Sequence, residues 1–88
     1  MSKKALVSVF DKVACLYSPV MTEVNPESAI RNFKIGAKQN QQINACPEDY
    51  SLVLIGYIDD ETGSIVSASE NDQPVVLIQA KDVFPVIV

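Results

Sequence analysis

The sequence has no histidine and no tryptophan, and only two of its 88 residues are cysteines. Without histidine, neither a Ser-His nor a Cys-His catalytic pair can form. Cys15 and Cys46 are separated by thirty residues and form no C-x-x-C pair, which argues against a tetrahedral zinc site. We expect two buried free thiols in a reducing cytoplasm, with a disulfide between them as the alternative.

Glycine is also scarce, and long hydrophobic runs are missing. The three glycines, Gly36, Gly56 and Gly63, are too far apart to form a glycine-rich phosphate loop. No stretch approaches the roughly 18 apolar residues that a membrane-spanning helix needs. The apolar stretch after the first lysines is interrupted by an Asp-Lys pair after six residues, too early for a secretory signal. We therefore expect no membrane association and no nucleotide or other cofactor.

The remaining composition is that of a globular protein. Hydrophobic residues make up 48% of the chain and charged residues 20%, and its length suits a single domain over residues 1–88 with a small core. The net charge of −4 is divided unevenly: residues 1–40 carry six basic and three acidic side chains, and residues 41–88 carry one and eight. Nucleic acid repels a net acidic protein at long range, but the basic first half can still provide a local binding face.

Alternating and continuous apolar patterns predict five strands, over residues 4–10, 15–21, 51–58, 64–69 and 74–80. Pro19 cannot donate a hydrogen bond to a sheet, so the second of these strands should lie at an edge. One helix is predicted over residues 25–40, because Asn25 suits the N-cap and Pro26 suits the first helical position. Its core-facing residues recur at helical spacing and are Ala29, Ile30, Phe33 and Ala37.

These elements predict an α+β fold, with a small, mainly antiparallel sheet of about five strands and one helix in the order β-β-α-β-β-β. Residues 39–45 are expected to form a polar connection. The strand 51–58 is apolar on both faces, so it needs cover on both sides. A curled sheet, the apolar end segment or a second copy of the chain could supply that cover. We favour a homodimer, with an interface formed by Val83, Phe84, Val86 and Ile87.

The consecutive acids Asp59, Asp60 and Glu61 raise the question of a metal site. Side chains on an extended chain point alternately to opposite sides, so consecutive carboxylates converge poorly on one ion. A calcium loop of the helix–loop–helix type also needs a glutamate at its twelfth position, and none follows Gly63 at that distance. The flanking apolar strands and the turn-forming residues instead predict a tight hairpin, with Gly63 in the left-handed conformation. We therefore expect no metal site and no catalytic carboxylate pair here, and no enzyme activity.

Five short motifs occur in a fixed order along residues 10–65. They are Phe10-Asp11-Lys12, Tyr17-Ser18-Pro19, Asn25 followed by 29–33 (AIRNF), 47–52 (PEDYSL), and 56–59 (GYID) followed by Thr62-Gly63. Their order and spacing resemble the small non-structural protein of gokushoviruses, which are tailless Microviridae phages with circular single-stranded DNA genomes. The chain differs from that pattern at Tyr50 and Ile58, where phenylalanine is usual, and at Val20, where it is frequent.

The resemblance implies a non-structural phage protein in the cytoplasm of a bacterial host. It further implies DNA binding during genome replication, at the switch to single-strand synthesis and packaging. The last twenty or so residues lie outside the motifs that carry this resemblance.

The physical case for DNA binding starts from the predicted helix. Arg31, Lys34 and Lys38 are spaced three and four residues apart, so they lie on one helical face. Single-strand binders combine a basic track with exposed aromatic rings that stack on bases. Tyr17 and Tyr57 are the candidates for stacking, and Lys3, Lys4 and Lys12 could extend the basic track.

Each of these residues also has a simpler interpretation. Helices usually carry solvated basic residues on their outer face, and Arg31 could pair with Glu27 one turn earlier. Tyr57 lies on a strand with two apolar faces, so it can belong to the core. Two hypotheses follow: a dimeric factor that binds single-stranded DNA, or a non-catalytic module that contacts a replication, capsid or host protein.

Overall fold

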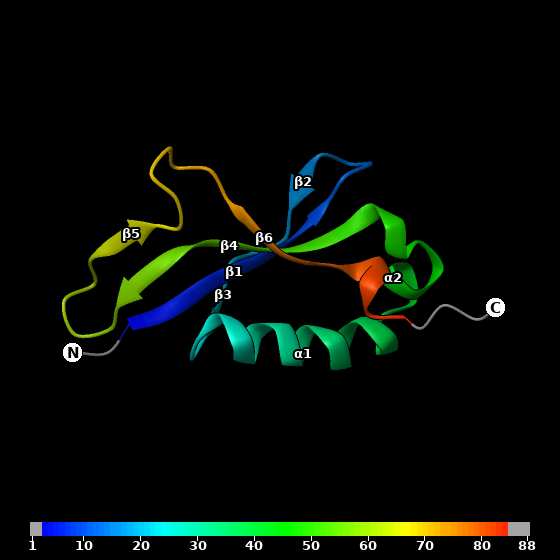
Figure 1. Cartoon of the computed structure of the whole chain (residues 1–88), viewed down its shortest axis with the longest axis horizontal. Helices are drawn as coiled ribbons and strands as arrows, with labels where there is room; N and C mark the ends of the chain where they lie inside the picture. Colours follow the sequence, from blue (N-terminus) through cyan, green and yellow to red (C-terminus); the bar gives the residue numbers. More distant parts are fainter. Residues whose placement is uncertain (1–2, 85–88) are drawn as a thin grey trace.

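The computed structural model describes residues 3–84, which form one antiparallel sheet with a long helix against one face (Figure 1). The centre of the sheet is β1 (Lys3–Asp11) paired with β4 (Tyr50–Asp59), from Lys3 opposite Asp59 to Asp11 opposite Tyr50 with one shift of register. Both strands are rich in β-branched and aromatic residues, which pack well on a pleated surface. Ile55 is an extra residue in β4, because Leu6 pairs with Gly56 and Val7 pairs with Leu54.

Two short strands extend each side of this central pair. On the free edge of β1 lie β2 (Leu16–Tyr17) and β3 (Met21–Glu23), and on the free edge of β4 lie β5 (Ile65–Ser67) and β6 (Val75–Gln79). The α+β class and the antiparallel sheet are thus confirmed, with six strands instead of about five. The strand predicted over 15–21 is divided because Ser18 leaves the ladder, its N–H donating to the Val9 carbonyl and its hydroxyl accepting from the Val9 N–H.

Helix α1 (Pro26–Gln39) confirms the predicted helix. The Asn25 side chain accepts a hydrogen bond from the Ser28 N–H at 2.7 Å, which caps the first turn. The buried residues of α1 are Ala29, Phe33 and Ala37. They meet Ala5, Val7, Leu52 and Leu54 from the central strands in a single core cluster.

The expectation of an irregular connection over 39–45 was wrong. Asn40 ends α1 and its side chain then caps a second helix, α2 (Gln41–Ala45), by accepting from the N–H groups of Gln42 and Ile43. The buried residue of this short helix, Ile43, joins the core cluster. A 3-10 turn at Pro47–Asp49 precedes β4, and another at Ala80–Asp82 follows β6. None of the helices within residues 3–84 is long and apolar enough to cross a membrane.

The face of β4 that points away from α1 is covered within one chain. Ser8, Ser51 and Val53 lie on that face and are at most 3% exposed. The Ser8 hydroxyl donates to the Ser18 carbonyl at 2.8 Å, and the Ser51 hydroxyl donates to Gln79 Oε1 at 2.8 Å. Figure 1 shows β2 and the segment between β5 and β6 rising on this side of the sheet. These three residues are therefore buried without a second copy, and the homodimer itself stays a prediction.

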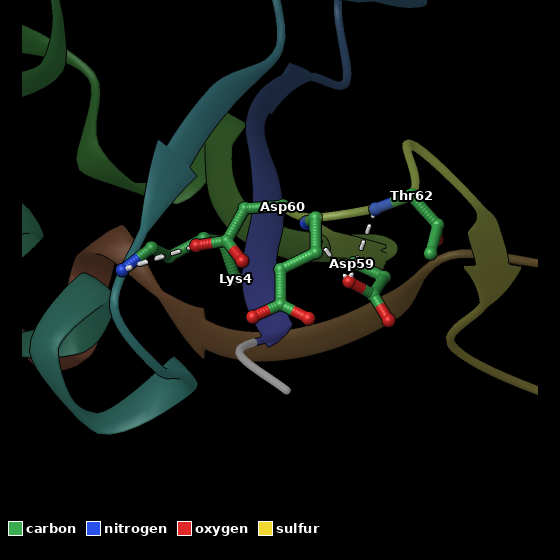
Figure 2. Close-up of polar contacts among 5 residues, drawn as sticks. Lys4, Asp59, Asp60 and Thr62 are labelled. Atoms are coloured by element: carbon green, nitrogen blue, oxygen red, sulfur yellow. Dashed lines mark hydrogen bonds and ion pairs between the residues drawn. The ribbon is translucent and has the colours of Figure 1, made fainter.

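The acidic segment after β4 is the predicted tight hairpin. The Asp59 N–H donates to the Ser64 carbonyl at 2.8 Å, and the Gly63 N–H donates to the Asp59 carbonyl at 2.7 Å. Asp59 Oδ1 accepts from the Glu61 N–H at 2.9 Å, while the Asp60 carboxylate lies 3.9 Å from the Lys4 ammonium (Figure 2). Gly63 has φ of +79°, as the turn chemistry predicted. The carboxylates of Asp59 and Asp60 thus have separate partners.

Replacing Gly63 by valine should lower the free energy of unfolding by about 1–2 kcal/mol, because a β-branched residue is strained at positive φ. No atom lies within 4 Å of a Cβ built at this position, so the strain would come from the backbone alone. Asparagine tolerates this conformation, so Gly63→Asn is the matched control in urea unfolding. Equal unfolding midpoints for the two variants would contradict the prediction.

The same hairpin makes a second expectation testable. Melting curves recorded with calcium and with EDTA should superimpose, since the loop uses its first acid to hold backbone N–H groups. A calcium-dependent rise in Tm would show instead that the carboxylates bind the ion.

Candidate functional site

The outer face of α1 carries three exposed basic residues. Arg31, Lys34 and Lys38 follow one another by three and four positions, and all three are exposed. None of them has an ion-pair partner among residues 3–84, so the alternative of a pair between Glu27 and Arg31 is not observed. Ile35 lies on the same face and is 57% exposed. The structure therefore confirms the placement of these three side chains on one open surface.

The other predicted basic residues do not join this face. Lys3 and Lys4 are at the start of β1, and Lys12 follows its end. The strand between them separates the two ends by roughly 25 Å. The Lys12 ammonium donates to Gln79 Oε1 at 2.8 Å and to the Glu48 carbonyl at 3.4 Å, which ties it to the 3-10 turns. The predicted lysines thus occupy separate places and do not form one continuous track.

Neither of the two aromatic candidates lies on the outer face of α1. Tyr17 is 49% exposed, and its ring centroid lies 4.6 Å from that of Phe10 at an interplanar angle of 37°. It sits on β2, which rises from the sheet on the side away from α1 (Figure 1). Tyr57 is half-buried and packs against the core cluster. The interpretation of Tyr57 as a core residue is therefore correct.

An apolar groove of about 550 Å³ lies between β2 and β3 on one side and α2 on the other. We call it the β2–β3 groove. Its apolar walls are formed mainly by Val9, Leu16, Met21, Ile43 and Tyr50. A hollow of about 240 Å³ between β3 and α1 shares Val9, Met21 and Ile43 with it, so the groove continues toward α1.

The groove exists because α1 and α2 do not cover the sheet as far as its β2–β3 edge. Leu16 and Met21 are 67% and 44% exposed at its rim. At its base, desolvation raises the pKa of the Tyr50 hydroxyl, and the nearby charge of Asp11 raises it further. Sequence reasoning missed this surface. The available signal was a segment, residues 16–24, with several large apolar residues in strands too short to bury them.

The residues predicted for a dimer interface fall into two groups. Val83 and Phe84 are half-buried and pack against the core cluster of their own chain. Val86 and Ile87 lie outside the described residues. The interface itself stays a prediction.

Both cysteines are free, but both are exposed, so the expectation of buried thiols was wrong. The reason is their position in turns: Cys15 closes the turn before β2 with φ of +58°, and Cys46 ends α2. Among the described residues, no three cysteine or acidic side chains are grouped so that they could hold a metal ion.

The fold and its surfaces define a small α+β protein whose notable surface features are a basic helix face and an apolar groove. A family model described as Phage ORF5 protein matches residues 4–83, and the chain belongs to this bacteriophage family. The match extends through β5 and β6, beyond the motifs that carried the resemblance seen in the sequence. No curated protein and no solved structure matches the chain.

Proposed function

We propose that the chain is a non-structural accessory protein of a gokushovirus-like phage of the Microviridae. It works in the cytoplasm of the bacterial host by binding, without catalysis and without a cofactor. Membership of the Phage ORF5 family supports the phage assignment. The order of the five sequence motifs supports the more specific assignment to a gokushovirus-like phage.

Its ligand in this proposal is the single-stranded DNA genome, bound during replication or at the switch to single-strand synthesis and packaging. The observation that carries the proposal is the outer face of α1, with three exposed basic side chains that have no ion-pair partner within residues 3–84. Such a face contacts phosphates and has little sequence preference. Tyr17 lies on the other side of the sheet, so we assign base stacking no part in binding at this face.

The test is fluorescence anisotropy with labelled single-stranded and double-stranded oligonucleotides at low and physiological salt. The wild type should bind single strands more weakly as salt rises. The double variant Arg31→Ala/Lys34→Ala should weaken binding, and the slope of log affinity against log salt should become shallower by about 1.4, for two lost phosphate contacts.

The matched control compares Lys34→Ala with Lys81→Ala, because both remove one exposed positive charge and only the first lies on α1. Lys81→Ala should leave the affinity close to that of the wild type. Flat anisotropy for the wild type, or equal losses in the two variants, would refute DNA binding through α1.

A second candidate function is a protein-interaction module that contacts a replication, capsid or host protein. The β2–β3 groove favours it, because a monomeric protein rarely leaves a hollow apolar surface in water without a use. This function predicts no salt-sensitive DNA affinity and a partner that loses binding when the rim residue Leu16 is made polar.

A further inference from the structure

The β2–β3 groove has the features of a surface made for an extended peptide. Its rim presents Leu16 and Met21, and its base is formed by Val9, Ile43 and Tyr50. Burying such side chains against another apolar segment is favourable by about 25 cal/mol for each Å² removed from water. Leu16 and Met21 at the rim are exposed, so a segment can reach the groove from solvent.

The backbone beside the groove is also available. Within residues 3–84, β2 and β3 pair with β1 on one edge and with no strand on the other. An edge strand presents N–H and C=O groups to which an added strand can bind. An extended occupant can therefore gain backbone hydrogen bonds from β3 as well as apolar contacts from the groove.

One segment of this chain matches both requirements. Residues 85–88, Pro-Val-Ile-Val, contain no charged or polar side chain. Valine and isoleucine favour the extended conformation, and proline is tolerated at the first position of a strand. A segment of this composition needs an apolar surface to cover it.

The last described residues of the chain do not line the groove. Phe84, the last described residue, packs against the core cluster and does not line the groove. All groove residues come from β1 to β4 and from α1, α2 and the connections between them, and none comes from β6 or the turn after it. We assign the groove to the segment of a second copy, and the mixing experiment below separates this arrangement from docking within one chain.

We propose that residues 85–88 of a second copy lie along β3 in the β2–β3 groove, and that the exchange is reciprocal. A two-fold dimer with two identical segment-in-groove contacts results. This proposal does not depend on DNA binding by α1, although a dimer would present two basic helix faces.

The test is the molar mass in solution, measured by size-exclusion chromatography with light scattering over a range of concentrations. The wild type should have twice the monomer mass of 9.6 kDa. Truncation after Phe84 should give a monomer with an unchanged far-UV spectrum. Leu16→Asp should raise the dissociation constant of the dimer about a hundredfold, because a carboxylate would face the bound apolar segment.

The matched control for Leu16→Asp is Ile65→Asp. Both residues occupy short edge strands and are almost equally exposed, at 67% and 66%, but Ile65 is remote from the groove on β5. Ile65→Asp should remain dimeric. Equal effects of the two substitutions would show that the groove is not the contact.

Mixing experiments separate exchange between chains from docking within one chain. The truncated chain keeps an intact groove, and Leu16→Asp keeps an intact segment 85–88. A mixture of the two should form a heterodimer with one working contact, while each alone stays monomeric. A monomeric wild type, a truncated chain that still dimerises, or a mixture without heterodimer would each overturn the proposal. The first result would leave the same chain or another protein as the occupant of the groove.

Discussion

Gly56→Ala should lower the free energy of unfolding by about 2–3 kcal/mol, the usual cost of forcing extra volume into a packed site. Gly56 is buried in β4 and pairs with Leu6 on one side and with Ser67 on the other. A Cβ at this position would overlap the carbonyl oxygen of Val66 and lie 3.2 Å from the carbonyl carbon. These are backbone atoms, so relief requires β5 to move away from β4.

The chain offers a control with the opposite expected sign. Gly36 is exposed in the middle of α1, and a Cβ built there meets no atom within 4 Å. Gly36→Ala should therefore raise the free energy of unfolding by about 1 kcal/mol through helix propensity. Urea unfolding of the two alanine variants measures both effects. An unchanged midpoint for Gly56→Ala would mean that β5 does not approach β4 as closely in solution.

Phe33→Ala should be the most damaging single truncation in α1, with a loss of about 3–5 kcal/mol. Phe33 is 8% exposed and is the largest side chain that α1 places in the core cluster. The whole stability of a domain is about 5–15 kcal/mol, and a chain this short belongs near the lower limit. We expect the variant to be largely unfolded at 37 °C. Its far-UV circular dichroism should show little secondary structure and no cooperative transition on heating.

Ile35→Ala removes a large apolar side chain from the same helix, two residues away. Ile35 is 57% exposed, so its truncation should change the free energy of unfolding by less than about 0.5 kcal/mol. Comparing Phe33→Ala with Ile35→Ala therefore separates the effect of burial on the free energy of unfolding from the effect of helix propensity. Similar losses in the two variants would contradict the packing of α1 on the sheet.

The basic face of α1 could be predicted from the sequence because helical spacing alone places residues three and four positions apart together. The position of that face relative to the other candidate DNA-binding residues could not be predicted from the sequence. Lys4 and Lys12 are only eight residues apart in the sequence, but β1 carries them roughly 25 Å apart, where they have separate partners. Tyr17 is placed on the other side of the sheet by its pairing with Phe10. The β2–β3 groove depends on how far two helices extend across a sheet, which no local pattern records.

The sequence by itself determined the elements whose causes are local. Asn25 and Pro26 start α1, Gly63 closes the hairpin after β4, and continuous apolar residues make β4 a central strand. Only the tertiary structure decided what depends on contacts between distant segments: the pairing of β1 with β4, the burial of Val53 within one chain, and the open edge beside β3. The physical reason is that capping, turn strain and periodicity act within a few residues. Strand pairing and helix coverage instead minimise the exposed apolar surface of the whole chain.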